Sequence, residues 1–121
     1  MEIVIKTKRV YEKPLKKDGC RILIDRIWPR GISKKVAKLN DWNIKIAPTV
    51  TLRKWFNHDP ELWAEFQKKY VAELKKNEAV AFFVKNHLDT KVITLIYAGN
   101  DKEHTHALVL QQYLVEKFNE I

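Results

Sequence analysis

Cysteine, glycine and proline are scarce in this chain, and hydrophobic residues are not. Of the 121 residues, 1 is cysteine, 3 are glycine and 4 are proline. The single cysteine, Cys20, cannot form an internal disulfide and cannot by itself build a thiolate zinc site. Because 45% of the residues are hydrophobic, the chain can bury enough apolar surface to fold. The composition excludes global disorder, and the length predicts one domain over residues 1–121.

Long hydrophobic runs are absent too. The longest lie at 79–84 and 92–99, far short of the roughly 20 residues that a membrane-spanning helix needs. The first residues, MEIVIK, lack the apolar stretch and the cleavage site of a secretory signal. With a single cysteine, these absences predict a cytoplasmic protein that has no membrane segment.

Positive charge is in excess, and it is unevenly distributed. The formal net charge is +8. Residues 1–54 hold 15 Lys and Arg against 5 Asp and Glu, whereas residues 55–121 hold 8 against 10. A basic half can attract phosphates or nucleic acid, and scattered lysines that only keep a protein soluble would give the same sum.

Hydrophobic patterns and helix-capping residues predict strands alternating with helices. The expected strands lie at 2–11, 20–27 and 91–98. The expected helices lie at 33–39, from 49 or 51 to 56, from 60 to 74, at 78–88 and at 102–119, with a short turn opening at Asp41. The stretch 78–88 is equally compatible with a strand by periodicity alone, and Asn77 as a cap favours the helix.

Two of the expected strands, 20–27 and 91–98, contain nearly continuous apolar runs, which are typical of strands covered on both faces. The sequence therefore predicts an α/β fold with a small, mainly parallel sheet flanked by helices. The connection between the first two strands is short for a parallel crossover that carries a helix, so these two strands are either parallel or antiparallel.

Polar residues follow two of the expected strands, where a parallel sheet places its ligand crevice. The segment after the second strand carries Asp25, Arg26 and Arg30. The segment after the third strand begins the last helix, whose free N–H groups attract anions. The candidate ligand-binding residues are Asp25, Arg26, Arg30, Asn100 and His106, and the candidate catalytic residues are Tyr97, Asp101 and His104.

Each candidate also has a structural explanation. Asp25 and Arg26 can form an internal ion pair, and Tyr97 can be a core residue. Asp101 is expected at the N-cap of the last helix, which places His104 in its first turn, where the helix dipole keeps the imidazole neutral and able to act as a base. His106 is expected to face the sheet, held by a hydrogen bond in the core.

No metal site and no cofactor are predicted. His104 and His106 are two residues apart, which on a helix directs them differently, unlike the i, i+4 pair of a helical zinc site. The leading function is binding of an anionic small molecule, such as a nucleotide or phosphate ester, by an enzyme or a non-enzymatic protein. An enzyme of this kind would use histidine acid/base chemistry.

A second function rests on the basic half of the chain. Arg53, Lys54 and Trp55 mix cations with an aromatic ring, a combination that can contact phosphates and stack on bases. The alternative is therefore a non-catalytic module that binds nucleic acid or a protein partner. Core packing of the aromatic residue with solvated cations beside it explains the same pattern, and so does an interaction protein whose polar cluster is only structural.

Three strings resemble one known family. DRIWPRG at 25–31, LRKWFNHDP at 52–60 and IYAGNDKEHTHA at 96–107 are similar to the YeaO-like branch of a bacterial family of uncharacterised proteins. They occur in the same order over nearly the whole chain. The resemblance implies a compact, cytoplasmic α/β domain of a bacterium or archaeon, and it implies no established reaction.

The other branch of that family differs at two places. It has a Cys-Ala-Glu-like strand end and a Cys-His-Arg-like helix start, where this chain has Tyr97-Ala98-Gly99 and Thr105-His106-Ala107. Both cysteines and the acidic residue are missing. Thiol chemistry of that branch therefore does not transfer to this chain, whereas the resemblance retains Asp101, His104 and His106.

Overall fold

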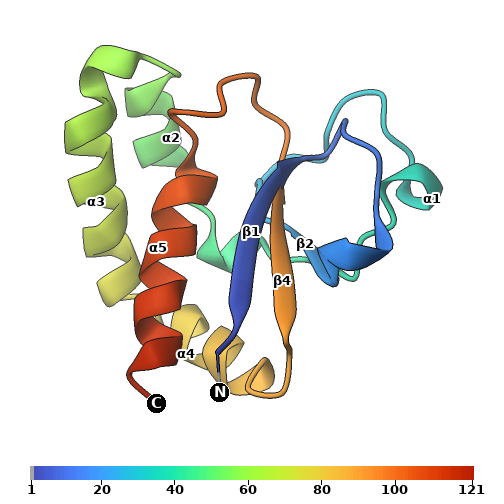
Figure 1. Cartoon of the computed structure of the whole chain (residues 1–121). Coiled ribbons are helices and arrows are strands. Elements are labelled where there is room, and N and C mark those ends of the chain that lie inside the picture. Colours follow the sequence, from blue (N-terminus) through green and yellow to red (C-terminus); the bar gives the residue numbers. More distant parts are fainter. Residues whose placement is uncertain (1) are drawn as a thin grey trace.

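The computed structural model of the chain describes residues 2–121. Its sheet has four strands in the order β1-β4-β2-β3, and each strand runs parallel to its neighbours (Figure 1). The strands are β1 (Val4–Arg9), β2 (Cys20–Leu23), β3 (Asp41–Trp42) and β4 (Val92–Tyr97). The prediction of an α/β fold with a small parallel sheet is confirmed.

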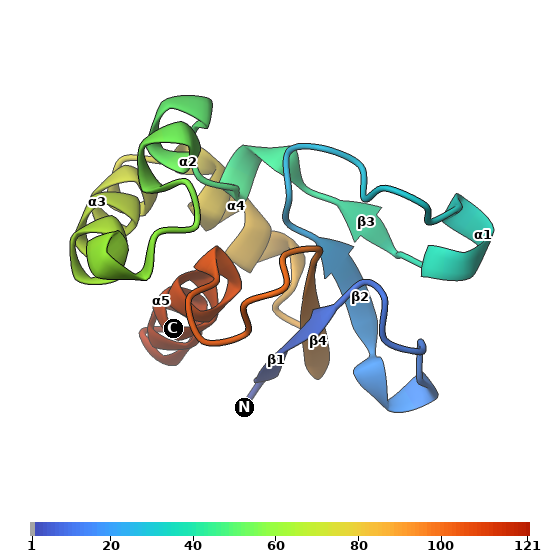
Figure 2. The same ribbon diagram turned by 90° about the horizontal axis from the view of Figure 1, so that it is seen from above.

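Helices cover the two faces of this sheet unequally. The helices are α1 (Lys34–Ala37), α2 (Val50–Phe56), α3 (Trp63–Lys75), α4 (Glu78–Asn86) and α5 (His106–Asn119). Short 3₁₀ turns lie at Lys16–Asp18, Ile44–Ile46 and Pro60–Leu62. Seen from above, α2, α3 and α5 lie on one side of the sheet and α1 on the other (Figure 2). The sheet is thus the middle layer of three.

The central strand β4 shows why the apolar runs are continuous. Successive side chains of a strand point to opposite faces, and here both faces are buried. Ile93, Leu95 and Tyr97 join the large core beneath the helices, whereas Ile96 joins the small core that includes Ala37 of α1. The expected central strand at 91–98 is therefore confirmed.

The relation between the first two strands is settled by the strand between them. Both β1 and β2 pair with β4 in parallel, with Lys6 and Arg21 each opposite Thr94. They are therefore parallel to each other and not adjacent. The segment that connects them spans residues 10–19, and its one helical element is the 3₁₀ turn at Lys16–Asp18. The segment ends with Gly19, whose φ is +66°. A β-carbon at Gly19 would lie 2.6 Å from the carbonyl oxygen of Val92, so this turn requires glycine.

Two sequence-based boundaries were wrong. The strand expected at 20–27 ends at Leu23. The N–H group of Ile24 still donates to the carbonyl oxygen of Ile96, and after this hydrogen bond the chain leaves the sheet. The expected turn at Asp41 is instead the two-residue edge strand β3, which pairs with β2. Two residues are too few to show a strand period in the sequence.

Helix starts were easier to predict. The side chain of Asn77 caps α4, as expected. The side chain of Thr49 caps α2, which decides between the two starts that the sequence allowed, Thr49 and Thr51. Asp59 caps the 3₁₀ turn that begins with Pro60 and continues into α3. Each cap satisfies N–H groups that have no partner inside the helix, so this signal is local and readable in the sequence.

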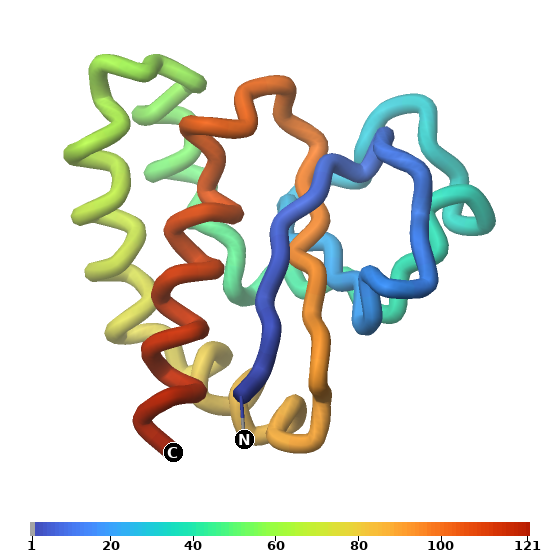
Figure 3. The backbone as a smooth tube through the Cα atoms, in the orientation of Figure 1, coloured from blue at the N-terminus to red at the C-terminus, as the bar shows by residue number. Residues whose placement is uncertain are grey.

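The two chain termini and the loop that links β4 to α5 lie at opposite ends of the molecule. Figure 3 shows the start of β1 and the end of α5 together, and the segment that links β4 to α5 at the opposite end. The carboxyl ends of the parallel strands lie at that opposite end. Within residues 2–121, no helix combines the length and the apolar character that a membrane span requires.

Candidate functional site

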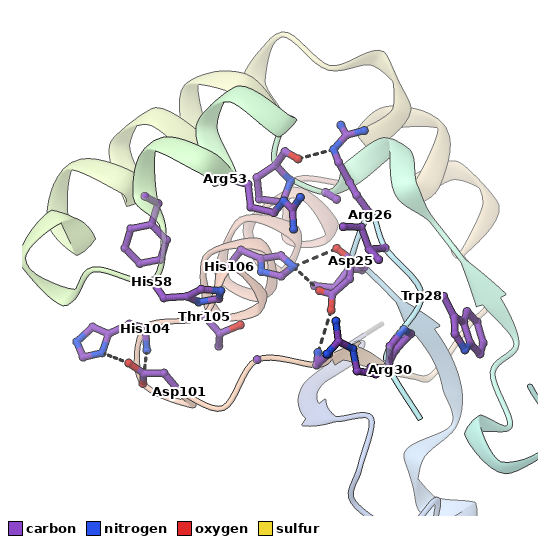
Figure 4. A pocket seen from close by; sticks show the side chains of 18 of the residues that line it. Asp25, Arg26, Trp28, Arg30, Arg53, His58, Asp101, His104, Thr105 and His106 are labelled. Atoms are coloured by element: carbon purple, nitrogen blue, oxygen red, sulfur yellow. Dashed lines mark hydrogen bonds and ion pairs between the residues drawn. The ribbon is translucent and has the colours of Figure 1, made fainter. Parts of the chain in front are cut away.

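A cavity of about 390 Å³ opens beyond the carboxyl ends of β2 and β4. Its size lies within the usual range of ligand pockets, about 300 to 1,000 Å³. Three parts of the chain supply most of its lining: residues 24–30 after β2, residues 98–106 before and at the start of α5, and side chains from α2 and α3. The crevice expected at the strand ends is therefore present, and Figure 4 shows the side chains that line it.

Asp25 is the first charged side chain of the cavity after β2. Its Oδ2 accepts the Ala98 N–H at 2.9 Å, a bond that takes the place of the next rung of the β2–β4 ladder. Its Oδ1 lies 3.1 Å from Nε2 of His106. Asp25 therefore ties the end of β2 to both the end of β4 and the start of α5.

His106 is the first residue of α5, and its ring points back toward the sheet. Nε2 lies 3.0 Å from the carbonyl oxygen of Ile24 and 3.1 Å from Oδ1 of Asp25. Because a carbonyl oxygen only accepts hydrogen bonds, Nε2 carries the proton and donates. The expectation that His106 faces the sheet and is held by a hydrogen bond is confirmed.

His104 lies in the loop before α5, and its partner is Asp101. Nδ1 of His104 lies 2.7 Å from Oδ2 of Asp101, and the His104 N–H donates to Oδ1 at 3.1 Å. The hydrogen bond from the His104 side chain is the largest cause that holds the pKa of Asp101 below its usual value. An ionised carboxylate only accepts, so Nδ1 donates and Nε2 is left without the proton in the neutral ring.

The helix start predicted here was wrong. Helix α5 begins at His106, and the side chain of Thr105, not of Asp101, accepts an N–H of its first turn. Asp101 instead closes a turn by accepting the N–H groups of Glu103 and His104. Both residues are capping types, and a local pattern does not decide between two successive caps. His104 is therefore outside the helix, and the argument from the helix dipole does not apply to it.

Three arginines line the cavity, and only Arg26 is paired. Its Nε donates to the carbonyl oxygen of Pro48 at 2.6 Å, so the ion pair with Asp25 that the sequence allowed is not formed. Figure 4 shows Arg30 and Arg53 reaching toward the Asp25–His106 pair from two different segments, and no hydrogen bond or ion pair among the residues drawn involves their guanidinium groups. Two exposed cations thus share one cavity, and no anionic side chain of residues 2–121 is bound to either of them.

Two predicted site residues lie outside the lining. Tyr97 is 3% exposed and packs in the large core, and this burial is the main reason that its pKa is raised. Asn100 is exposed, and its Oδ1 accepts a hydrogen bond from Arg9 at 2.9 Å. The catalytic role of Tyr97 and the ligand role of Asn100 remain predictions that no contact with the cavity supports.

The residues of the nucleic-acid alternative lie together on α2, but they face different surroundings. Arg53 lines the cavity. Lys54 is exposed and is not part of the lining. The ring of Trp55, which is 36% exposed, lies 5.1 Å from Nζ of Lys69. A ring already covered by a lysine is a poor platform for a base.

Known proteins with similar sequences place the chain in a family. A family model described as the inactive DUF488-N3 subclade matches residues 4–121. The chain belongs to this subclade. It is 38% identical over 110 residues to Uncharacterized protein YeaO of Escherichia coli (strain K12), covering 91% of this chain and 96% of the relative. It is 37% identical over 113 residues to Uncharacterized protein Rv3073c of Mycobacterium tuberculosis (strain H37Rv), covering 93% and 95%.

The resemblance to a YeaO-like family is thus confirmed. No solved structure matches this member of the DUF488-N3 subclade. Among its described residues, no group of three or more His, Cys, Asp and Glu side chains is placed to hold a metal ion.

Several residues at the cavity of this DUF488-N3 chain were not predicted, and three of them are polar side chains from other parts of the chain. His58 lines it with a left-handed backbone, φ +57°, and its only signal in the sequence was its place in the second family string. Tyr11 also lines it, and Arg9 bonds the loop before α5. Arg9 is the last residue of the edge strand β1 and Tyr11 lies two residues beyond it, and the position of β1 beside β4 is decided by the fold.

Proposed function

We propose that the cavity binds an anionic small molecule, such as a nucleotide or another phosphate ester. The observation that carries this proposal is the pair of unpaired guanidinium groups, Arg30 and Arg53, directed into one cavity. Guanidinium groups bind phosphate oxygens with short, charge-assisted hydrogen bonds. Two of them from separate segments match an anion with several oxygens.

The charges around the cavity support the same ligand class. Three arginines and two aspartates line it, and both carboxylates already accept hydrogen bonds from the protein. A bound anion would therefore meet guanidinium groups that have no protein partner and carboxylates that already accept hydrogen bonds from the protein. Apolar side chains, including Ile24, Phe56 and Phe66, supply a floor for the uncharged part of the ligand.

Binding without turnover is favoured over catalysis. The subclade is described as inactive, and the cysteines and acidic residue of the other branch are absent at positions 97, 99 and 105. Acid/base catalysis by His104 is the second candidate, and a specific contact favours it. Asp101 holds Nδ1 at 2.7 Å and leaves Nε2 free to take a proton.

The test is a calorimetric titration with inorganic phosphate, nucleoside monophosphates and sugar phosphates. Because hydrogen bonds to charged groups contribute about 1.5–3 kcal/mol, we expect Arg53→Gln or Arg30→Gln to weaken binding about 10- to 100-fold. Lys54→Gln is the matched control, since Lys54 is the neighbour of Arg53 on α2 and does not line the cavity. Equal losses for Arg53→Gln and Lys54→Gln, or no binding of any probe, would overturn the proposal.

Catalysis is tested on the same probes. Binding without turnover leaves each phosphate ester unchanged after long incubation, as followed by phosphate release. Release that disappears in His104→Gln and persists in His58→Gln would replace binding by acid/base catalysis.

A further inference from the structure

The end of β1 touches both of the loops that line the cavity. Arg9, the last residue of β1, donates from Nε to the Gly99 carbonyl at 2.6 Å and from Nη2 to the Ala98 carbonyl at 3.0 Å. Nη2 also lies 2.9 Å from Oδ1 of Asn100. One guanidinium group therefore bonds three successive residues of the loop that leads to α5.

Two residues further on, Tyr11 reaches the other loop. Its hydroxyl group donates to the Arg30 carbonyl at 2.8 Å. The guanidinium carbon of Arg9 lies 5.0 Å from the centre of the Tyr11 ring, so the two side chains also contact each other. Tyr11 is 44% exposed, and the burial of its ring does not account for its position.

The backbone between these two residues is anchored to the sheet. The Val10 N–H donates to the Tyr97 carbonyl at 2.7 Å, which extends the β1–β4 ladder by one rung. The side chain of Val10 enters the small core. The Glu12 N–H donates to the Arg9 carbonyl at 3.1 Å, so the chain turns here. This turn leaves the Tyr11 ring beside the Arg9 guanidinium group and in the lining of the cavity.

The loops themselves contain no regular helix or strand between Leu23 and Lys34 or between Tyr97 and His106. Arg30 lies on the first loop, and Asp101 and His104 lie on the second. Side chains, more than a backbone ladder, therefore determine how far apart the two cavity walls stand.

We propose that Arg9 and Tyr11 form a brace, defined as these two side chains and their contacts, that sets the spacing of the two loops and thereby the affinity of the cavity for its anion. Arg9 and Tyr11 are positioning residues, because they hold the loop backbones and leave the anion to Arg30 and Arg53. The brace rests on the proposed function only in its effect on affinity.

Two substitutions separate the parts of the brace. Tyr11→Phe removes only the hydroxyl group and keeps the ring beside Arg9. Arg9→Lys keeps the charge but loses the planar fork that makes three hydrogen bonds at once. Tyr113→Phe is the matched control, because Tyr113 lies on α5 and lines no part of this cavity.

The experiment combines hydrogen exchange with calorimetry, using inorganic phosphate and a nucleoside monophosphate as probes. In Tyr11→Phe we expect faster exchange in residues 24–32 and, from the typical net value of one hydrogen bond, affinity lower by about two- to tenfold. In Arg9→Lys we expect faster exchange in residues 98–105 as well, and a larger loss of affinity. The melting temperature of Tyr11→Phe should fall by only a few degrees, because one hydrogen bond is lost, and Tyr113→Phe should change neither exchange in these loops nor affinity.

Unchanged exchange in residues 24–32 of Tyr11→Phe would overturn the brace. Faster exchange with unchanged affinity would overturn its positioning role. The exchange measurement needs no ligand, so it decides the brace even when the wild-type chain binds neither probe, and that result overturns the proposed function alone.

Discussion

Two clusters of charged side chains on this molecule differ in whether their charges are paired. In the first, Oδ2 of Asp18 accepts from Nη1 of Arg21 at 2.7 Å and from Nζ of Lys8 at 3.0 Å. The remaining donors of Arg21 bond the carbonyl oxygens of Ala37 and Lys38. In the second, at the cavity, the guanidinium groups of Arg30 and Arg53 make no comparable bonds.

Burial explains the difference. The side chains of Asp18 and Arg21 are each 4% exposed, and charges that leave water must be paired. Burial alone would raise the pKa of Asp18, but the Leu15 N–H and the hydrogen bonds of Lys8 and Arg21 outweigh it and hold that pKa below its usual value. Arg30 and Arg53 are exposed, so water can solvate their charges without a protein partner. Paired buried charges thus mark a structural cluster, whereas the unpaired charges at the cavity are what the proposed anion site rests on.

Removing the carboxylate of the buried cluster is the strongest way to test this contrast. We expect Asp18→Asn to lower the free energy of unfolding by about 3–5 kcal/mol, because it leaves the buried Arg21 without its counter-charge. Urea unfolding followed by circular dichroism measures this loss. Glu120→Gln, which removes an exposed ion pair with Lys117, is the control and should leave the midpoint unchanged. Similar midpoints for the two variants would contradict the contrast.

The two histidines of the cavity should differ in the same sense. We expect His106→Ala to destabilise the fold by about 1–3 kcal/mol, because the Ile24 carbonyl and the Asp25 carboxylate each lose a partner. His104→Ala should cost less, since the His104–Asp101 pair is more exposed. Thermal melting compares the variants. A large loss in His104→Ala with an intact His106→Ala would reverse the two roles.

Acid should weaken the buried cluster in a defined pH range. The pKa of Asp18 is lowered from 3.8 in the folded chain, so the unfolded chain takes up the proton first as the pH falls. The contribution of Asp18 to the free energy of unfolding is complete above the pKa of this group in the unfolded chain. It is lost as the pH falls through the lower pKa of the folded chain. Urea midpoints between pH 7 and pH 2 should fall less steeply at the acid end for Asp18→Asn. Parallel curves would show that Asp18 does not contribute.

The smallest effect is expected for the nucleic-acid alternative. With a net charge of +8, the chain should bind oligonucleotides weakly at low salt and lose them as salt rises. Lys54→Gln combined with Trp55→Ala should weaken this binding only slightly, because it removes one of 23 Lys and Arg cations and a ring that already contacts Lys69. A fluorescence titration at two salt concentrations measures it. A marked loss in the double variant would favour a nucleic-acid interface.

Much of the fold could be read from the sequence because its signals are local. Helix starts are predicted by capping residues that lie within a few residues of them: Thr49, Asp59 and Asn77. The apolar run at 92–96 predicts a strand that is buried on both faces. The last helix was misplaced where two capping residues, Asp101 and Thr105, compete. β3 was not predicted because its two residues form a strand only through their hydrogen bonds to β2.

The candidate site was only half predictable. Parallel strands must end at one edge of a sheet, so the sequence placed Asp25, Arg30 and His106 near one crevice. Nothing local indicated that Arg26 would bond Pro48, and the sequence left both a core role and a catalytic role open for Tyr97, which packs in the core. The cytoplasmic location and the anionic ligand stay predictions.

The sequence by itself determined most of the segments that become strands and helices, β3 and the start of α5 excepted, since hydrophobic period and capping act over a few residues. It also determined the family, through three strings at 25–31, 52–60 and 96–107. Only the tertiary structure decided that β1 would lie beside β4, which brings Arg9 and Tyr11 to loops that lie far from them along the chain. Those contacts depend on the order of strands in the sheet, and that order is set by the packing of all layers together.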